Sequence, residues 1–462
     1  MTRFRDLAHN HDFTVLWTGQ TISELGSRMS SFVFPILALQ LSGSTLIASI
    51  AEATYLVGVA GALLPAGILA DRFHRGRLMR LASGSGALLY GSLVVAGILG
   101  HLTVAHLLVV GLFAGLGTGL FGPAEIAAVK EVVTTEELPT ALSQNEARQH
   151  LASILGSPVG GALYGIARWV PFAADAVSYA VSFVLLGRLR TDLSPKRAAV
   201  PTRVRRDLAE GFTYIARQPF LRAVLVFSAT VNLTINAIFF VTLIRLVHGG
   251  FSAGQIGLAE AAASVCGILG ALLAPAIIDR FATGRLTVVI AWSWVPLLVP
   301  LALWNHPAVV AAALGTGLLL NPAGNAGIGS YRVATTPDEL QGRVTSTMQF
   351  TSWSTMPLAP VVGGVLLHTL GGPGAITALG IVTALVAVFV TLSPAVRRVP
   401  RPAEWDSATR LAPPVPELSC EMCRTIATGG SGESVGEGTG PGVTELGKRD
   451  VELVRAARED RE

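Results

Sequence analysis

A few charged side chains interrupt stretches of the chain that are otherwise apolar. A charge inside an apolar helix is costly unless it is paired or serves a purpose, so each one is a candidate functional residue. A carboxylate can bind and release a proton, and an arginine beside it forms a charge-assisted pair that can also hold a polar ligand. The candidate chemistry of this chain therefore resides in Glu24, Arg28, Glu52, Glu125, Asp175, Arg245 and Glu260.

Three of these residues are predicted to form one cluster. Glu24 and Arg28 are four residues apart, which places them on one face of a helix. At 1.5 Å per residue, Arg28 lies about 22 Å from the start of its apolar stretch, and Glu52 lies about 9 Å into the next one, which runs the opposite way. These depths nearly coincide in an apolar layer about 30 Å thick. We predict that Arg28 bridges Glu24 and Glu52, for substrate binding or proton coupling; the alternative is a static ion-pair network.

Twelve apolar stretches must position these side chains. A membrane helix needs about 20 mostly apolar residues, and each stretch is a candidate for one. The chain is 51% hydrophobic and only 14% charged, which is too little charge for the surface of a soluble protein. It has no phosphate loop of the Gly-Lys-Ser/Thr type, no catalytic triad and no metal-ligand spacing, so we expect no enzyme, no cofactor and no metal. We predict an all-α membrane protein with transmembrane helices near 13–40, 46–69, 78–100, 103–125, 145–167, 171–188, 220–246, 255–278, 286–304, 308–328, 345–368 and 374–392.

Basic residues gather in the connections on one side of these helices. This bias predicts a multi-pass protein of the cell (cytoplasmic) membrane with both termini in the cytoplasm. It also explains the net charge of +4, so we expect no nucleic-acid partner. We interpret the Cys420-x-x-Cys423 pair as a chance pair. The predicted domains are a cytoplasmic N-terminus at 1–12, a six-helix bundle at 13–188, a cytoplasmic central loop at 189–219, a second six-helix bundle at 220–392 and a disordered cytoplasmic tail at 393–462.

The second bundle repeats the first at a spacing of 208 residues. Residues 71–78 (DRFHRGRL) recur as 279–286 (DRFATGRL) with six of eight positions identical, and 51–53 (AEA) recur as 259–261. Chance does not readily supply several such matches in one order. The two bundles are therefore predicted to be parallel repeats, as in transporters that rock one half against the other.

The repeat also relates the candidate charges of the two halves. Glu52 corresponds to Glu260, whereas Glu24 and Arg28 correspond to Asn232 and Asn236. The second half thus keeps the glutamate and loses the arginine, which makes Glu260 a candidate for proton coupling. The alternatives are a neutral Glu260 hydrogen-bonded to Asn232 or Asn236, and a pair with Arg245 if that side chain bends back.

Several motifs resemble the major facilitator superfamily over about residues 10–392. The segment Gly67-x-x-x-Asp71-Arg72-x-x-Arg75-x-Arg77 is similar to its loop signature between the second and third helices. Further motifs resemble the branch of enterobactin-type siderophore exporters and macrolide-efflux-type proteins. They are Leu16-Trp17-x-Gly19-Gln20, Gly122-Pro123-Ala124, Glu136-Glu137-Leu138-Pro139 and Asp338-Glu339-Leu340-x-Gly342-Arg343.

The resemblance implies roles for particular residues. The loop signature and its repeat imply a gating motif at Gly67, Asp71, Arg72, Arg75, Arg77, Asp279, Arg280 and Arg285. Helices 1, 4, 7 and 10 line the central cavity in this fold, which implies Gln20, Glu24, Arg28, Asn232, Asn236, Asn321 and Asn325 as cavity residues. Trp17, Phe239, Phe240 and Trp353 could add apolar walls. We expect proton coupling at Glu260, Glu52 and Glu24, a cap or outer latch at Asp175, and a gate or interface at Glu125.

We therefore expect a monomeric secondary active transporter that exports a small amphipathic compound, such as a drug, a siderophore or another secondary metabolite, by proton antiport. Its partners would be that substrate, protons and the lipid bilayer. The first alternative is uptake, or exchange driven by the gradient of a solute. The second is a membrane receptor or scaffold that transports nothing and signals through the C-terminal tail.

Overall fold

A computed structural model describes residue 7, residues 9–194 and residues 204–405. Within these residues every regular element is a helix, as predicted. The remaining segments, including the tail from residue 406 with its Cys420 and Cys423 pair, lie outside the described residues.

The helices of the first half begin and end at local signals. The side chains of Asn10, Ser44 and Thr103 accept hydrogen bonds from the first turns of the helices that follow them. The first helix ends at Gly43, whose φ of 67° is a left-handed conformation that glycine adopts without strain. The helices are α2 (His11–Ser42), α3 (Thr45–Arg72), α4 (Arg75–Ile98), α5 (Val104–Val132), α6 (Leu138–Ile166) and α7 (Val170–Leu186).

The second half repeats this order after one additional helix. Ser252 and Gln255 form a reciprocal capping box at the start of its second membrane helix. Gly371, with φ 68° and ψ 179°, separates the last two membrane passes. The elements are α8 (Val204–Arg217), which lies in the expected central loop, α9 (Pro219–His248), α10 (Ala253–Arg280), α11 (Thr283–Leu303), α12 (Pro307–Thr335), α13 (Asp338–Thr355), α14 (Leu358–Leu392), α15 (Pro394–Arg397) and η1 (Pro402–Glu404).

Eight helical stretches of the described residues are long and apolar enough to cross a membrane. One of them, residues 340–392, is 53 residues long. At 1.5 Å per residue it would measure about 80 Å, so it must cross a core about 30 Å thick twice, turning at Gly371. The shorter α7 is also apolar. Large apolar side chains such as Leu88, Ile166 and Leu272 are 73–78% exposed, as side chains that face lipid would be.

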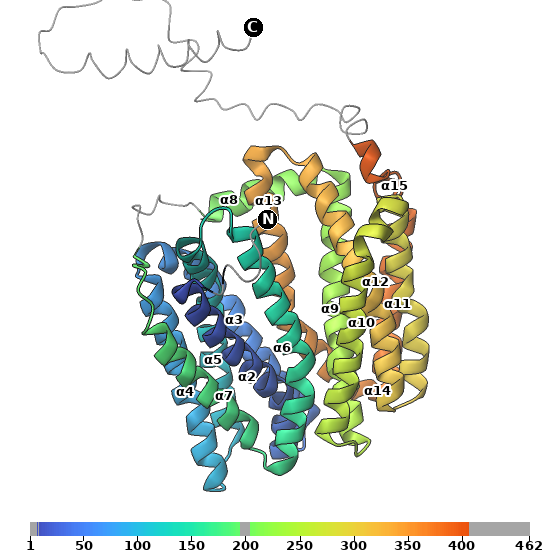
Figure 1. The fold of residues 1–462 in the computed structure, drawn as a ribbon. Coiled ribbons are helices and arrows are strands. Elements are labelled where there is room, and N and C mark those ends of the chain that lie inside the picture. The colour runs from blue at the N-terminus through green and yellow to red at the C-terminus, as the bar shows by residue number, and fades with distance from the viewer. Residues whose placement is uncertain (1–6, 8, 195–203, 406–462) are drawn as a thin grey trace, which may run out of the picture. The chain divides into compact units, whose positions relative to one another are not determined.

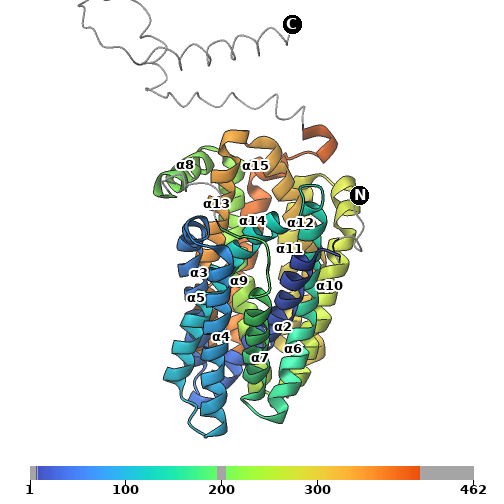
Figure 2. The same ribbon diagram turned by 60° about the vertical axis from the view of Figure 1, so that its left-hand side comes forward.

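The two ends of the helix bundle carry different connections. The signature end carries the connections around residues 73–74 and 281–282, together with α8 and α15 (Figures 1 and 2). The turn end carries the connections at residues 43–44, 99–103 and 249–252.

Equivalent helices pack in the same way in the two halves. In the first half, α3 and α5 approach so closely that a Cβ on Gly115 would lie 2.1 Å from the Tyr55 carbonyl oxygen. In the second half, α10 and α12 do the same, and a Cβ on Gly270 would lie 2.0 Å from the Leu319 carbonyl oxygen. The repeat found in the sequence is therefore also a repeat of helix packing.

The two halves touch through close glycine contacts toward the turn end. A Cβ on Gly161 of α6 would lie 2.3 Å from the carbonyl oxygen of Ala253, the first residue of α10. A Cβ on Gly257 would lie 2.3 Å from the Ser157 carbonyl oxygen. On the other side of the interface, Gly364 of α14 packs against Ser49 of α3. These contacts bring backbone against backbone and leave no room for larger side chains.

At the signature end, the segment after the last helix of each half binds that half's signature loop. The Arg75 amide donates to the Leu193 carbonyl at 3.2 Å. The Thr283 amide donates to the Pro400 carbonyl at 3.3 Å, and the Gly284 amide donates to the Val399 carbonyl at 3.2 Å. Residues 394–405 are thus packed on the second half, although the sequence placed them in a disordered tail.

Candidate functional site

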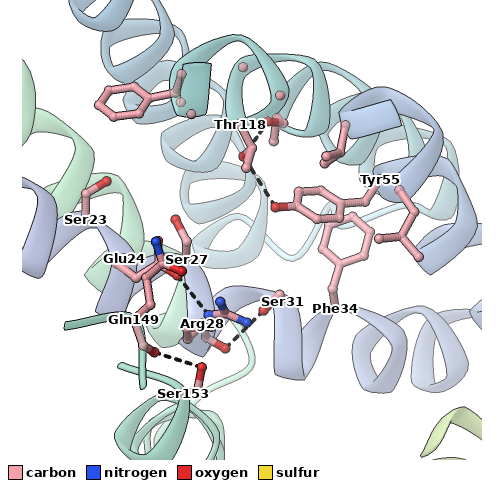
Figure 3. A pocket seen from close by; sticks show the side chains of 18 of the residues that line it. Ser23, Glu24, Ser27, Arg28, Ser31, Phe34, Tyr55, Thr118, Gln149 and Ser153 are labelled. Atoms are coloured by element: carbon pink, nitrogen blue, oxygen red, sulfur yellow. Dashed lines mark hydrogen bonds and ion pairs between the residues drawn. The ribbon is translucent and has the colours of Figure 1, made fainter. Parts of the chain in front are cut away.

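A cavity of about 850 Å³ lies among the helices, and most of its walls come from the first half (Figure 3). Each of the helices α2 to α7 contributes polar lining residues, while α9, α10 and α13 contribute three aromatic rings and one carboxylate. The polar and aromatic residues that line the cavity include Gln20, Glu24, Ser27, Arg28, Glu52, Tyr55, Glu125, Ser157, Tyr179, Phe239, Phe240, Glu260 and Trp353.

Glu24 and Arg28 form the predicted ion pair. The Arg28 Nε donates to the Glu24 Oε1 at 2.9 Å, one helical turn away (Figure 3). The Arg28 side chain is 45% exposed, so water in the cavity weakens the attraction. Gly156 makes room for this pair, because a Cβ there would lie 2.3 Å from the Arg28 Cβ.

The expected bridge from Arg28 to Glu52 is not formed. Within the described ranges no ion pair joins the two residues, since the Arg28 guanidinium turns back along its own helix to Glu24. Glu52 interacts electrostatically with Glu260 instead. Equal depth on neighbouring helices was therefore not enough to predict a contact, because helix rotation decides which way a side chain points.

Glu52 and Glu260 are the equivalent residues of the two repeats, and they approach each other across the interface between the halves. Both line the cavity. The Ser157 hydroxyl donates to the Glu260 Oε2 at 2.8 Å. No cation of the described residues pairs with either carboxylate. The two halves thus bring two acids of the same kind together beside a close-packed contact.

The predicted partners of Glu260 bind elsewhere. The Asn232 amide donates to the Ser228 carbonyl at 2.9 Å, and the Asn236 amide donates to the Asn232 carbonyl at 2.7 Å. Arg245 donates to the Leu301 carbonyl at the end of α11. All three therefore satisfy backbone carbonyls and leave Glu260 to Ser157.

The four asparagines that the resemblance implied as cavity residues are not among its lining residues. In α12, Asn325 donates to Asn321 at 3.1 Å. The prediction took the cavity-lining helices from the resemblance, whereas the cavity is formed mainly by the first half. Of the four aromatic residues, Phe239, Phe240 and Trp353 line the cavity, while Trp17 packs in a separate apolar cluster near Phe13.

Glu125 and Asp175 are the two remaining carboxylates that were predicted to have a role. Glu125 lines the cavity and accepts from the Arg148 Nη2 at 2.8 Å. Arg148 is only 3% exposed, and it was not predicted as a site residue, although it lies in the first turn of the expected fifth span. Asp175 is neither a cap nor an outer latch. Trp169 caps α7, and Asp175 lies six residues further on, fully buried against α2.

The signature residues lie at one end of the bundle. The Arg75 Nη1 donates to the Glu131 Oε1 of α5 at 3.3 Å. Glu131 was not singled out from the sequence. Gly67 and Asp71 lie on α3, but the surroundings of Gly67 and the Asp71 side chain are outside the described part of the structure. The remaining signature residues are exposed: Arg72, Arg77, Asp279, Arg280 and Arg285.

The chain matches the family model of the Major Facilitator Superfamily twice, over residues 16–249 and 225–421. The multidrug efflux pump Tap of Mycolicibacterium fortuitum is 27% identical over 398 residues, which are 81% of this chain and 93% of that protein. Tap of Mycobacterium tuberculosis (strain ATCC 25618 / H37Rv) is 26% identical over 399 residues, which are 81% of this chain and 91% of that protein.

Solved structures show the same fold. A bacterial homologue of the iron transporter ferroportin, in an inward-facing state, aligns with a TM-score of 0.67 at 14% identity, covering 84% of this chain and 99% of that one. The nucleoside transporter NupG also aligns with a TM-score of 0.67, at 12% identity, covering 82% and 100%. Together with the family match and the apolar helices, these findings make the chain a multi-pass membrane transporter and a member of the Major Facilitator Superfamily.

Proposed function

We propose that this transporter exports small amphipathic compounds of the multidrug type across the cell membrane in exchange for protons. The Tap relatives, which are multidrug efflux pumps, support export, because the similarity runs over nearly their whole length. The gathering of basic residues at the signature end supports a cytoplasmic location for that end.

The cavity supports the choice of substrate class. Its about 850 Å³ suit a molecule of drug size. Phe239, Phe240 and Trp353 offer flat apolar contacts from the second half. The charged lining residues are four carboxylates and one arginine, which favour a neutral or cationic ligand over an anion. They are Glu24, Glu52, Glu125, Glu260 and Arg28.

Alternating access follows from where the halves touch. The glycine contacts hold the halves together toward the turn end. At the signature end, the ion pairs Arg75–Glu131, Arg148–Glu125 and Arg343–Glu210 each join elements of one half. This arrangement supports a cavity reached from the cytoplasm. Rocking the halves would exchange the closed turn end for a closed signature end.

The presence of Glu52 and Glu260 in one cavity, where they interact electrostatically, is the single observation that carries the proposed proton coupling. Two ionised carboxylates repel, so a proton on either of them would favour close packing of the halves. A proton that binds from outside would let the turn end close. Its loss to the cytoplasm would restore the repulsion and open the turn end, so that substrate bound from the cytoplasm leaves to the outside. One cycle would then exchange substrate for protons.

The test is transport driven by a pH gradient in vesicles that contain the purified protein. Glu52→Gln and Glu260→Gln keep the size of each side chain and remove its proton exchange. We expect gradient-driven efflux of a fluorescent lipophilic cation to fall about tenfold or more in both variants. Glu146→Gln, on the exposed face of α6, is the matched control. Normal gradient-driven efflux in both variants would overturn the coupling.

A further inference from the structure

We propose that Asp175 is a second proton-binding site, contained in the first half alone, which exchanges its proton with the cavity through Ser27 and Tyr179. The Glu52–Glu260 pair needs both halves, whereas this site needs only α2 and α7. Its part in transport rests on the proposed antiport, but its binding of a proton does not.

The surroundings of Asp175 suit a neutral acid. The residue is 0% exposed. Its Oδ1 accepts from the Ser178 hydroxyl at 3.2 Å and lies 3.5 Å from the Ser27 hydroxyl. Its Oδ2 has no hydrogen-bond partner within the described part of the chain. A buried carboxylate anion with a bare oxygen is strongly disfavoured, and a proton on that oxygen removes the charge.

A second buried polar atom lies close to the Asp175 carboxyl. Ser30 of α2 is 0% exposed, and its hydroxyl forms no hydrogen bond with a described residue. It lies close enough to interact with the Asp175 carboxyl. A protonated Oδ2 is a donor that can bond to this hydroxyl, so one proton would satisfy both atoms. Gly26 allows α2 to lie this close to Asp175 of α7, because a Cβ at residue 26 would lie 2.8 Å from the Asp175 Oδ1.

The charged and titratable groups around Asp175 supply no cation. α2 presents Glu24 and Arg28, which pair with each other at 2.9 Å. α4 presents Tyr90, whose ring stacks on Tyr179 of α7 at 5.9 Å. α3 presents Tyr55, whose hydroxyl donates to the Thr118 hydroxyl at 3.3 Å. Each of these groups is neutral, acidic or already paired, so a proton is the available source of positive charge.

A short chain of hydroxyls leads from this carboxyl to the cavity. The Ser27 hydroxyl lies 3.5 Å from the Asp175 Oδ1 and 3.0 Å from the Tyr179 hydroxyl. Ser27 and Tyr179 both line the cavity, and Figure 3 shows Ser27 on the same helix as Glu24 and Arg28. Hydroxyls both donate and accept, so they can pass a proton between the acid and cavity water.

Infrared spectroscopy of the full-length protein in lipid nanodiscs at neutral pH tests the site. We expect a carboxylic-acid C=O band that is absent in Asp175→Asn. If that variant does not fold, ¹³C-labelling of aspartate in the unsubstituted protein should shift the same band. A band that stays in Asp175→Asn, or does not shift on labelling, would overturn the proposal. The band should persist in Glu52→Gln/Glu260→Gln, so the proposed coupling can fail while this site stands.

The route is tested by transferring the protein to D₂O. The deuterium shift of the Asp175 band should slow by about tenfold or more in Ser27→Ala/Tyr179→Phe. Ser31→Ala is the matched control, because Ser31 lines the cavity on α2 but bonds only to the Arg28 carbonyl. An equally fast shift in the double variant and the unsubstituted protein would exclude this route.

Discussion

The two arginine–glutamate pairs beside the cavity differ in burial, and burial decides what each one contributes. Glu24 and Arg28 are 29% and 45% exposed, so water can solvate either partner when the other is removed. Arg148 is 2% exposed in its side chain and already has two nitrogens without a hydrogen-bond partner. Its charge depends on Glu125 alone. The first pair is therefore free to serve a ligand, while the second one holds α5 to α6.

This difference predicts that the same Glu→Gln substitution destabilises the protein much more in the second pair than in the first. Glu125→Gln leaves a buried guanidinium without its counter-charge and should cost about 3–5 kcal/mol of stability. Glu24→Gln should cost about 1 kcal/mol or less. Thermal unfolding of the two purified variants in one detergent measures the contrast. Equal melting temperatures would contradict the account of the buried pair.

Asp12 shows that a carboxylate can also be built to stay ionised. It begins α2 ahead of the apolar stretch and accepts from the backbone amides of Arg190 and Thr191, at 3.1 Å and 2.7 Å. Burial raises the pKa of Asp12, but hydrogen bonds from the Thr191 side chain, His11 and these amides outweigh it and lower the pKa from 3.8 to about 2. The link it makes to the chain after α7 is lost only as the pH falls through that range, so it does not respond to physiological pH.

At the scale of elements, the closing of the turn end depends on glycines that let α6 and α10 touch. Gly161 meets the Ala253 carbonyl, whereas Gly165, one helical turn further on, faces open space. A methyl group at residue 161 must push the halves apart, whereas a methyl group at residue 165 would contact no neighbouring atom. The two positions therefore form a matched pair.

We expect Gly161→Ala to shift the transporter toward a state that is open at the turn end. The variant is made in a protein with Cys266, Cys420 and Cys423 replaced by serine and with a reporter at Gln40→Cys, next to the contact. Maleimide labelling from outside intact cells should be faster than in the parent. Gly165→Ala should label at the parent rate. Equal labelling in the two alanine variants would show that this contact does not hold the turn end closed.

The sequence allowed the elements to be predicted better than the contacts between them. Apolar length and helix periodicity are local properties, so the membrane helices, their repeat and the Glu24–Arg28 pair could be predicted. The partner of Glu52 could not, because it depends on how two halves pack. Asp175 was misplaced as a cap for a related reason: its neighbours Ser27 and Ser30 are about 150 residues away in the chain.

At the scale of the whole molecule, the internal repeat of the chain explains how the proposed proton coupling could arise. Equivalent positions of two parallel repeats approach each other near the symmetry axis that relates them. Glu52 and Glu260 are such a pair, which explains why one motif supplies both acids. The protonation of these two carboxylates would then control whether the halves separate at the turn end. The proposed coupling therefore concerns the motion of the halves rather than the binding of substrate.

The most direct measurement is the distance between spin labels at Gln40→Cys and His248→Cys, on opposite halves at the turn end, in acidic and alkaline buffer. The same cysteine-free background is used. The account predicts a longer distance in alkaline buffer, and no response to pH in Glu52→Gln/Glu260→Gln, while Glu146→Gln keeps the response. A response to pH that survives in the double variant would contradict the claim that these two carboxylates control the closing of the turn end.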